Sequence, residues 1–366
     1  MGIKLEKLTP LSAIHPGEIL KDELDERNIK QKDFAELIGT LPSQLSEILN
    51  GKRGINADYA VLIGEALNMD PKIWLNLQSN YELDKSRIND RIRKRVEAIN
   101  QWQMIQPYIP ETYLRKLGYI KGDPFQDVSE IKAIYQIEHL DQLPGMSNQF
   151  AFARYRKSEK SEVNTINLTG WACLVLSEAK KLSVPSFDHT TQNKLIESLR
   201  NVIYKNTETL ARVRETLYDY GIKLIILNHP DNCAVDGFSF WSAGNPGIGL
   251  SLRFNRVDYF AFTLFHELGH IFHHLVNNNQ ASFIDEETES MQDQSREELE
   301  ANNFAKDNLI HPEKWRVFIS SSTRTQEMTI LKFARQERIH PAIVKGRLSH
   351  ETGNYRIKTR FENKIN

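Results

Sequence analysis

A strongly apolar segment, from about Val257 to Leu275, carries the run HELGH near its centre. Apolar residues recur at helical spacing on both sides of the run, so the segment is predicted to be one helix. Unpaired polar groups inside an apolar helix are costly, so His266, Glu267 and His270 require a structural or chemical reason. Two histidines four residues apart on a helix lie on the same face, one turn from each other.

This spacing is typical of a zinc site, in which imidazole nitrogens converge on one ion. His266 and His270 are the candidate ligands. Glu267 lies about 100° further round the helix, where it can hold a metal-bound water and act as the general base of peptide hydrolysis. The alternative is a helix with surface histidines, because H-E-x-x-H arises by chance in roughly a few per cent of chains of this length. The apolar surroundings favour the metal site.

A catalytic zinc ion usually takes three protein ligands and a water, so a third ligand is expected. A helix predicted from about Ser295 to Leu309 offers Glu297, Glu298 and Glu300. Of these acids, only Glu298 shares a face with small and apolar residues of that helix, namely Ala301, Ala305 and Leu309. Glu298 is therefore the predicted third ligand, and the other acids of this region fit a solvated charged face.

Two further side chains are expected to support the ligands. Asn302 follows Glu298 by one turn, where it can hydrogen-bond the second ring nitrogen of a ligand histidine or a nearby backbone group. His274 lies on the face of His270, four residues later. As a fourth ligand it would fill the position that the water needs, so a supporting role is the better interpretation.

The regions beside the site suggest two ways of handling a substrate. The strand predicted from Ile248 to Arg253 is either a docking strand for an extended peptide or an ordinary strand of the sheet. The acidic stretch from Asp285 to Glu300 is a candidate lid.

Composition narrows the cellular setting. The two cysteines, Cys173 and Cys233, are far apart in a chain of 366 residues, which argues against a disulfide framework and fits a reducing compartment. The start, MGIKLEKLTP, lacks the apolar core of a signal peptide. Glu267 and four histidines exclude the segment 257–275 as a membrane span. We therefore expect a cytoplasmic protein that does not bind membranes.

Charge is unevenly distributed along a chain whose net charge is only -1. Residues 1–84 hold 9 Lys+Arg and 14 Asp+Glu (net -5), and residues 85–121 hold 9 and 3 (net +6). The change coincides with the end of a helical pattern and predicts a domain boundary near Asp84. We expect three domains, residues 1–84, 85–165 and 166–366. The basic middle stretch fits either a solvated helical linker or an arm that faces phosphates.

Hydrophobic periodicity predicts a mostly helical chain with a few strands. Residues 15–83 fit a set of short helices, and residues 100–220 are also mostly helical. Strands are expected at Lys223–Leu227, Gly237–Trp241 and Ile248–Arg253, with Asn245-Pro246-Gly247 as a turn. A final helical segment is expected at Glu327–Ser349.

The C-terminal motifs resemble the ImmA/IrrE metallopeptidase family. HELGHIFHH followed by EELEANNFAKDNLI is similar to the family's HExxH and E-x-x-A-N-x-F-A pattern, and the likeness covers roughly residues 170–350. It implies zinc bound by His266, His270 and Glu298, with Glu267 as the base. It also implies cleavage of DNA-binding repressors or antitoxins, often in a stress response.

The N-terminal segment, with HPGEILKDEL, NIKQKDFAELIG and LSEILNGKRGI, resembles HigA-type antitoxins of the XRE helix-turn-helix class over residues 15–83. The resemblance implies a homodimer whose third helix, Pro42–Leu49, enters the major groove of operator DNA. Ser43, Gln44 and Glu47 would then face bases. Gln31, Lys52 and Arg53 would approach phosphates.

The segment departs from that class in two places. Leu41 stands where a capping serine is usual, with Thr40 or Ser43 as partial substitutes, and Glu47 stands where a basic residue is common. Together with the negative charge of residues 1–84, these departures argue against strong nonspecific DNA binding. A helical domain that binds another protein instead of DNA remains the alternative.

Together these features predict an α+β, mostly α, protein: an all-α helix-turn-helix domain, a helical middle region and a zincin-like domain with a small sheet and the HExxH helix. The first functional hypothesis is a DNA-binding zinc endopeptidase that cleaves a repressor or antitoxin and regulates transcription. The alternative is an antitoxin-like repressor that neutralises a toxin, with the peptidase domain as a sensor or self-cleaving switch. A structural role with a dead site is disfavoured by the intact HELGH and Glu298. One Zn²⁺ per chain is expected, although a His/His/Glu set also accepts Mn²⁺.

Overall fold

The structure is a computed structural model that describes residues 10–146, 162–286 and 295–366. The chain divides into two compact units, residues 1–102 and 103–366, each with its own core. The protein is mostly α-helical with one small sheet, as the sequence predicts. The central part of the acidic candidate lid, residues 287–294, lies outside the described residues, as does part of the predicted middle domain, residues 147–161.

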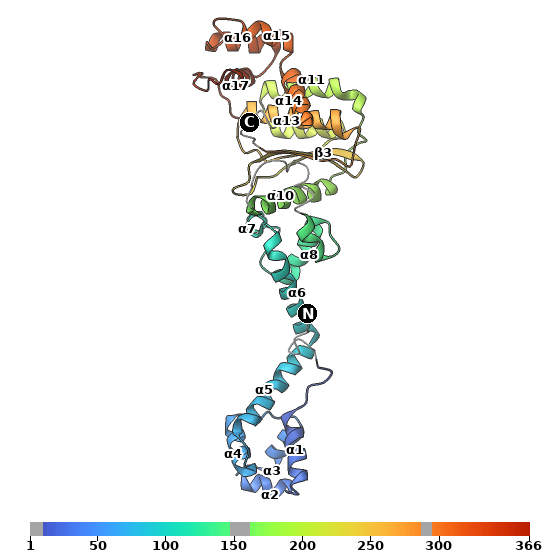
Figure 1. Cartoon of the computed structure of the whole chain (residues 1–366), viewed down its shortest axis with the longest axis vertical. Helices are drawn as coiled ribbons and strands as arrows, with labels where there is room; N and C mark the ends of the chain where they lie inside the picture. Colours follow the sequence, from blue (N-terminus) through green and yellow to red (C-terminus); the bar gives the residue numbers. More distant parts are fainter. Residues whose placement is uncertain (1–9, 147–161, 287–294) are drawn as a thin grey trace. The chain divides into compact units, whose positions relative to one another are not determined.

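In the described part of the N-terminal unit, all regular elements are helices (blue to teal in Figure 1). They are α1 (Pro16–Glu26), α2 (Gln31–Leu37), α3 (Pro42–Leu49), α4 (Ala57–Leu67), α5 (Pro71–Ile88) and most of α6 (Asp90–Ile105). The apolar faces of α1 to α5 meet in a core that includes fully buried Leu20, Phe34, Leu45, Ile63 and Trp74. The short helices of residues 15–83 are thus confirmed.

The cap of α3 and the end of α5 test two local expectations about this unit. Leu41 is the N-cap residue of α3 and no side chain caps the helix; Thr40 instead donates a hydrogen bond to Oε1 of Gln44 (2.9 Å). The expectation that Thr40 or Ser43 replaces the capping serine is therefore wrong. The helix α5 continues past residue 84 to Ile88, and the division into three domains stays a prediction.

The second unit begins with η2 (Gln106–Tyr108) and the helices α7 (Glu111–Lys116) and α8 (Pro124–Tyr135), followed by η3 (Leu140–Gln142). After them come α10 (Glu162–Lys181), η4 (His189–Thr191), α11 (Gln192–Lys205) and α12 (Thr209–Asp219). The sheet and the metal-site helices follow: β1 (Lys223–Ile226), β2 (Val235–Ser242), β3 (Asn245–Leu250), α13 (Val257–His270), the π-helical turn η5 (Ile271–Leu275), β4 (Phe283–Glu286) and α14 (Arg296–Leu309). The unit ends with α15 (Pro312–Ile319), α16 (Glu327–Glu337) and α17 (Pro341–Thr352).

The four strands form one sheet in the order β1-β3-β2-β4. β1 is parallel to β3, whereas β2 is antiparallel to both β3 and β4. The turn between β2 and β3 is Ala243-Gly244, both with positive φ (50° and 86°), which matches the twist of a two-residue hairpin. The expected turn at residues 245–247 is therefore wrong, because these residues already pair with β2.

β3 has a neighbouring strand on each side, so both of its edges are used within the sheet. The hypothesis that residues 248–253 dock a substrate as an added strand is therefore wrong. Among the described residues, β4 pairs only with β2 and lies at an edge of the sheet. Within the described residues, β4 and β1 are the two edge strands.

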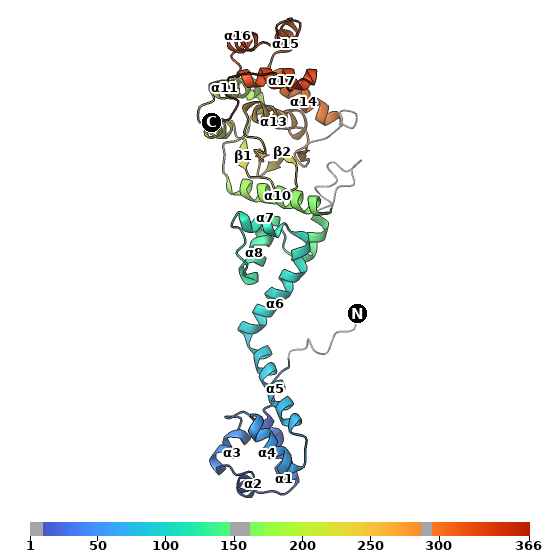
Figure 2. The same cartoon turned by 90° about the vertical axis from the view of Figure 1, so that its left-hand side faces the viewer.

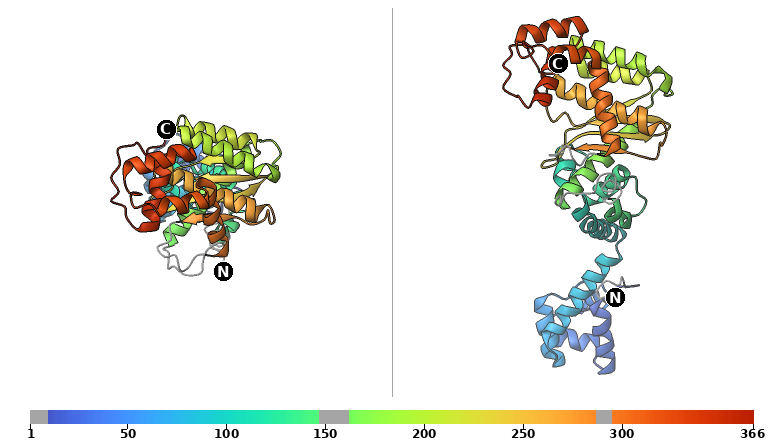
Figure 3. Two further views of the ribbon diagram at one scale, coloured as in Figure 1. Left: turned by 90° about the horizontal axis from the view of Figure 1, so that it is seen from above. Right: turned by 45° about the horizontal axis from the view of Figure 1, so that its top comes forward.

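Helices cover both faces of this sheet. Figures 1 and 2 show α10 on one face and α13 on the other. α14 packs along α13 (Figure 3, orange), and α17 contacts α13 as well. Leu264, Phe265 and Leu268 of α13 are completely buried in the core of the unit. The metal-site motif is thus held on the most deeply packed helix of the unit.

Candidate metal centre

The three polar residues of HELGH lie at the C-terminal end of α13, on the helix that the sequence predicts. His266, Glu267 and His270 are each at most 1% exposed, so they lie in the interior beside the sheet. The helix changes directly after His270, where residues 271–275 form a π-helical turn closed by the bond from Val276 N to Ile271 O (3.1 Å). Such turns are frequent at functional sites.

α14 brings the predicted third ligand to the histidines. Ser295 caps the helix by accepting a hydrogen bond from Glu298 N (3.3 Å), which places Glu298 in the first turn. Gly269 allows α14 to come close: a Cβ on this residue would lie 2.9 Å from Cα of Ala301. The side of α13 that Gly269 leaves without a side chain is therefore occupied by α14.

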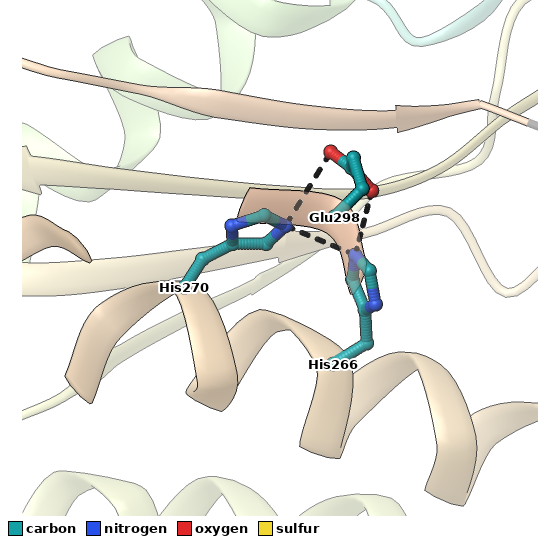
Figure 4. A group of neighbouring side chains, drawn as sticks. All are labelled: His266, His270 and Glu298. Atoms are coloured by element: carbon teal, nitrogen blue, oxygen red, sulfur yellow. Dashed lines mark hydrogen bonds and ion pairs between the residues drawn. The ribbon is translucent and has the colours of Figure 1, made fainter. Parts of the chain in front are cut away.

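Figure 4 shows Glu298 facing both imidazole rings. Its carboxylate oxygens lie 3.3 Å from Nε2 of His266 and 3.6 Å from Nε2 of His270, and the two Nε2 atoms are 3.0 Å apart. Three ligands about 2.0–2.1 Å from a tetrahedral zinc ion would be separated by about 3.3 Å. The three residues therefore fit a metal ion in both donor chemistry and spacing.

Each histidine has a contact at its other ring nitrogen, from the residues that the sequence singles out. Nδ1 of His266 lies 3.0 Å from Oδ1 of Asn302, and Nδ1 of His270 lies 3.1 Å from Nδ1 of His274. A proton on Nδ1 leaves Nε2 with its lone pair directed at the metal position. The geometry thus suits Asn302 and His274 as supports of the two rings.

Glu267 contacts β2, one of the two inner strands of the sheet. Its carboxylate accepts a hydrogen bond from the hydroxyl of Ser239, which also donates to the backbone oxygen of Glu267 (3.0 Å). Gly237 leaves the space for this carboxylate, because a Cβ there would lie 2.0 Å from Oε1 of Glu267. Sequence reasoning missed both residues; a glycine inside a predicted strand is the one signal of a close approach.

The edge strand β4 contributes an aromatic wall to the site. The ring of Phe283 stacks on His270 with centroids 4.4 Å apart and an interplanar angle of 12°. The sequence did not predict this strand, which has four residues only. Phe283 therefore lies beside the candidate ligand His270, at the start of an edge strand.

The predicted DNA-contacting residues lie on the N-terminal unit. Gln31 is the first residue of α2, and Ser43, Gln44 and Glu47 lie on α3. Ser43, Lys52 and Arg53 are exposed. Glu47, which stands where a basic residue is common in HigA-type antitoxins, forms an ion pair with Arg53 (2.8 Å). The negative charge of Glu47 is therefore balanced within the unit.

Family models match both parts of the chain. The family described as helix-turn-helix matches residues 20–74, and the family described as IrrE N-terminal-like domain matches residues 219–353. The second range contains the strands, α13 and α14, and hence every residue of the candidate metal centre.

Curated relatives align with the N-terminal part. Virulence-associated protein A' of Dichelobacter nodosus is 38% identical over 90 residues, which are 24% of this chain and 75% of the relative. The uncharacterized HTH-type transcriptional regulator YddM of Escherichia coli K12 is 34% identical over 68 residues, covering 19% of this chain and 72% of that protein.

Solved structures are similar to the same part. The Pseudomonas aeruginosa antitoxin HigA, solved with the higBA promoter, is 37% identical and covers 20% of this chain and 82% of its own, with a TM-score of 0.20. A putative antidote protein of a plasmid maintenance system from Nostoc punctiforme is 41% identical, covers 20% of this chain and 80% of its own, and also has a TM-score of 0.20.

The fold and the site thus define a two-part protein, in which a helical N-terminal unit is joined to a unit with a buried HExxH helix. The chain belongs to the helix-turn-helix family through its N-terminal part, and its C-terminal part contains an IrrE N-terminal-like domain. Within the described residues, no helix combines the length and apolar character that a membrane span requires.

Proposed function

We propose that this protein is a zinc metallo-endopeptidase that cleaves a regulatory protein, a repressor or an antitoxin, and regulates transcription through its helix-turn-helix unit. The observation that carries the proposal is the convergence of His266, His270 and Glu298, whose ligand atoms all lie within 4.8 Å of one another. Two helices, α13 and α14, supply these atoms. His266 and His270 are buried, which argues against a role as ordinary surface histidines. A His/His/Glu set matches catalytic zinc sites that keep one position for water.

When bound, zinc supplies a water of lowered pKa and polarises the carbonyl of the substrate. The carboxylate of Glu267 would take the proton of that water and later deliver it to the leaving amine nitrogen. The hydroxyl of Ser239 fixes the orientation of this carboxylate from the side of the sheet. Asn302 and His274 hold the ring orientation of the ligands.

The free edge of β4 offers a place for an extended peptide. An extended peptide that adds to an edge strand gains main-chain hydrogen bonds there. Phe283 begins β4 and stacks on His270, so a peptide paired with this edge would pass beside the metal position. We therefore assign the docking role to β4 in place of residues 248–253.

The helix-turn-helix unit would bring the enzyme to operator DNA. Two similar structures were solved with DNA, the HigA antitoxin with its promoter and PA4674 of Pseudomonas aeruginosa with its operator. By analogy α3 would enter the major groove, with Ser43, Gln44 and Glu47 toward bases. A homodimer through this unit would match a palindromic operator.

The experiment compares wild type with Glu267→Gln, which preserves the ligands and the shape of the side chain. Both are expressed in cells that lack the native protein, and new protein N-termini are identified by mass spectrometry. A regulator cleaved only in the wild-type cells, and then cleaved by the purified zinc-loaded protein, supports the proposal. Equal cleavage by wild type and Glu267→Gln would contradict it.

The antitoxin-like alternative is favoured by the likeness of the N-terminal part to HigA. It predicts operator binding and toxin neutralisation without cleavage of any other protein, apart from self-cleavage. Gel-shift measurements on wild type and Glu267→Gln separate the two. Loss of cleavage with intact operator binding supports the enzyme, whereas operator binding without cleavage by wild type favours the alternative.

A further inference from the structure

A chain of polar contacts leads from the metal-facing His270 to the surface of α14. Nδ1 of His270 lies 3.1 Å from Nδ1 of His274, and Nε2 of His274 lies 3.2 Å from Oε2 of Glu300. The other oxygen of Glu300 accepts a hydrogen bond from Nε of Arg296 (2.7 Å). Glu300 thus reaches the ligand histidine through one intermediate ring.

The direction of each hydrogen bond in this chain follows from the carboxylate. An ionised carboxylate can only accept, so Nε2 of His274 must donate its proton to Glu300. A neutral His274 then has a lone pair on Nδ1 and can only accept there. His270 must therefore carry its proton on Nδ1, which leaves on its Nε2 the lone pair that a metal ion would need.

The other ligand histidine is held differently. Nδ1 of His266 faces the amide of Asn302, which offers an acceptor at one end and a donor at the other. An amide that rotates by half a turn would support the opposite tautomer, whereas a carboxylate has no donor end. The contact of His270 therefore fixes its tautomer more strictly than the contact of His266 does.

The surroundings keep the intermediate ring in place. The side chain of His274 is 10% exposed, and the ring of Phe283 lies against both His270 and His274, with centroids 4.4 Å and 5.2 Å away. Glu300 itself is 38% exposed and lies at the rim, with Arg296 bound to its far side. A change at Glu300 can therefore alter the chain of contacts without opening the core.

We propose that Glu300 is a positioning residue, which acts through His274 to hold His270 in the tautomer that binds the metal ion. This inference rests on the proposed metal centre and adds a residue outside the HExxH and Glu298 set. Residues that orient a metal-binding histidine typically contribute 10–100-fold to metal affinity. Because Glu300 acts at one remove, we expect an effect of about 10-fold.

The first test measures zinc affinity of the full chain by competition with a chromophoric chelator. Glu300→Gln should bind Zn²⁺ about 10-fold more weakly than wild type, because the amide can donate to His274 and permit the other tautomer. Glu297→Gln is the matched control, since it makes the same change at an exposed position of the same helix. It should bind zinc as wild type does.

A double-mutant comparison separates positioning from a general effect on α14. In a His274→Ala background, Glu300→Gln should change zinc affinity less than about twofold, because the intermediate ring is gone. An undiminished effect of Glu300→Gln in that background would overturn the proposal.

The second test reads the tautomer in the metal-free protein. ¹⁵N NMR of labelled histidines should show His270 protonated at Nδ1 in wild type and a mixture of tautomers in Glu300→Gln, with equal unfolding midpoints. Wild-type zinc affinity and an unchanged His270 signal in Glu300→Gln would overturn the role of Glu300 alone. A wild type that binds no zinc would overturn the metal centre as well.

Discussion

Among single residues, Gly237 shows how tightly the proposed base is enclosed. A Cβ at this position would lie 2.0 Å from Oε1 and 2.7 Å from Cδ of Glu267, so the carboxylate would have to move. The candidate ligand Glu298, in contrast, comes from α14 and lies against Nε2 of His266 and His270. A larger residue at position 237 should therefore displace the carboxylate of Glu267 without displacing the candidate metal ligands.

We predict that Gly237→Ala keeps the zinc content of wild type but cleaves the regulator at least about 100-fold more slowly, the scale of a lost general base. Elemental analysis and single-turnover cleavage check the two parts. Ser239→Ala, which removes the hydroxyl without adding volume, should give a smaller loss. Wild-type cleavage by Gly237→Ala would contradict the assignment of Glu267.

A second residue-scale prediction concerns His15 at the start of α1. Its Nδ1 accepts a hydrogen bond from Gly17 N (2.9 Å), and burial lowers the pKa of His15 below its ordinary value of 6.5. Protonation is then easier in the unfolded chain than in the folded one. The free energy of unfolding of the N-terminal unit should thus fall as the pH drops below 6.5, and level off once the pH lies below the folded pKa.

Denaturant titrations of wild type and His15→Ser at pH 8 and pH 5 check this effect. Serine still caps the helix but does not titrate in this range, so its unfolding free energy should vary less with pH. The account of His15 would be contradicted if both proteins lost the same stability between the two pH values.

At the scale of elements, the distance between α13 and α14 controls the metal centre. Gly269 is the contact point, where a Cβ would meet Cα of Ala301 at 2.9 Å and Cβ of Phe304 at 3.1 Å. We predict that Gly269→Val forces the helices apart and lowers the free energy of unfolding by about 1–3 kcal/mol, as overpacking does. Zinc affinity should fall with it, because Glu298 moves away from both histidines.

Thermal unfolding of the metal-free protein and zinc competition measure the two effects of Gly269→Val. Leu299→Ala on the exposed face of α14 is the control and should leave zinc affinity unchanged. An unchanged zinc affinity in Gly269→Val would show that the helix spacing does not set the site.

The helices of the site could be predicted from the sequence because one apolar face repeats along each of them. That periodicity also put Glu298 and Asn302 on the inward face of α14, where the structure places them near the histidines. The π-helical turn after His270 could not be predicted, since the same residues fit a continued α-helix. β4 could not be predicted either, because its pairing with β2 depends on contacts distant in sequence.

The residues around Glu267 show the same limit. Nothing in the run GFSF distinguishes Ser239 from any other strand serine, and its contact with Glu267 arises only when α13 packs on the sheet. Which face of α13 packs on the sheet depends on contacts between residues that are distant in sequence. The spacing of residues within one helix could therefore be predicted from the sequence. The contacts that those residues make with other elements could not.

At the scale of the whole molecule, the two units have separate cores. The residues of the candidate metal centre all lie in residues 103–366, and the helix-turn-helix match lies in residues 1–102. We predict that a fragment of residues 103–366 folds and binds about one Zn²⁺, because all three candidate ligands lie within it. The fragment 1–102 should bind operator DNA without zinc.

Size-exclusion chromatography, elemental analysis and gel shifts on the two fragments check this division. The opposite result would be a fragment 103–366 that folds but takes up no zinc while the full chain does. It would mean that the N-terminal unit contributes to the metal centre.

The most direct test of the account is zinc-edge X-ray absorption on the full-length protein. The account predicts a spectrum with two imidazole nitrogens and one carboxylate oxygen, plus one further oxygen, all at about 2.0–2.1 Å. The imidazole signal should be lost in His266→Ala. A zinc ion with no imidazole in its coordination sphere, or no bound zinc in wild type, would contradict the central claim.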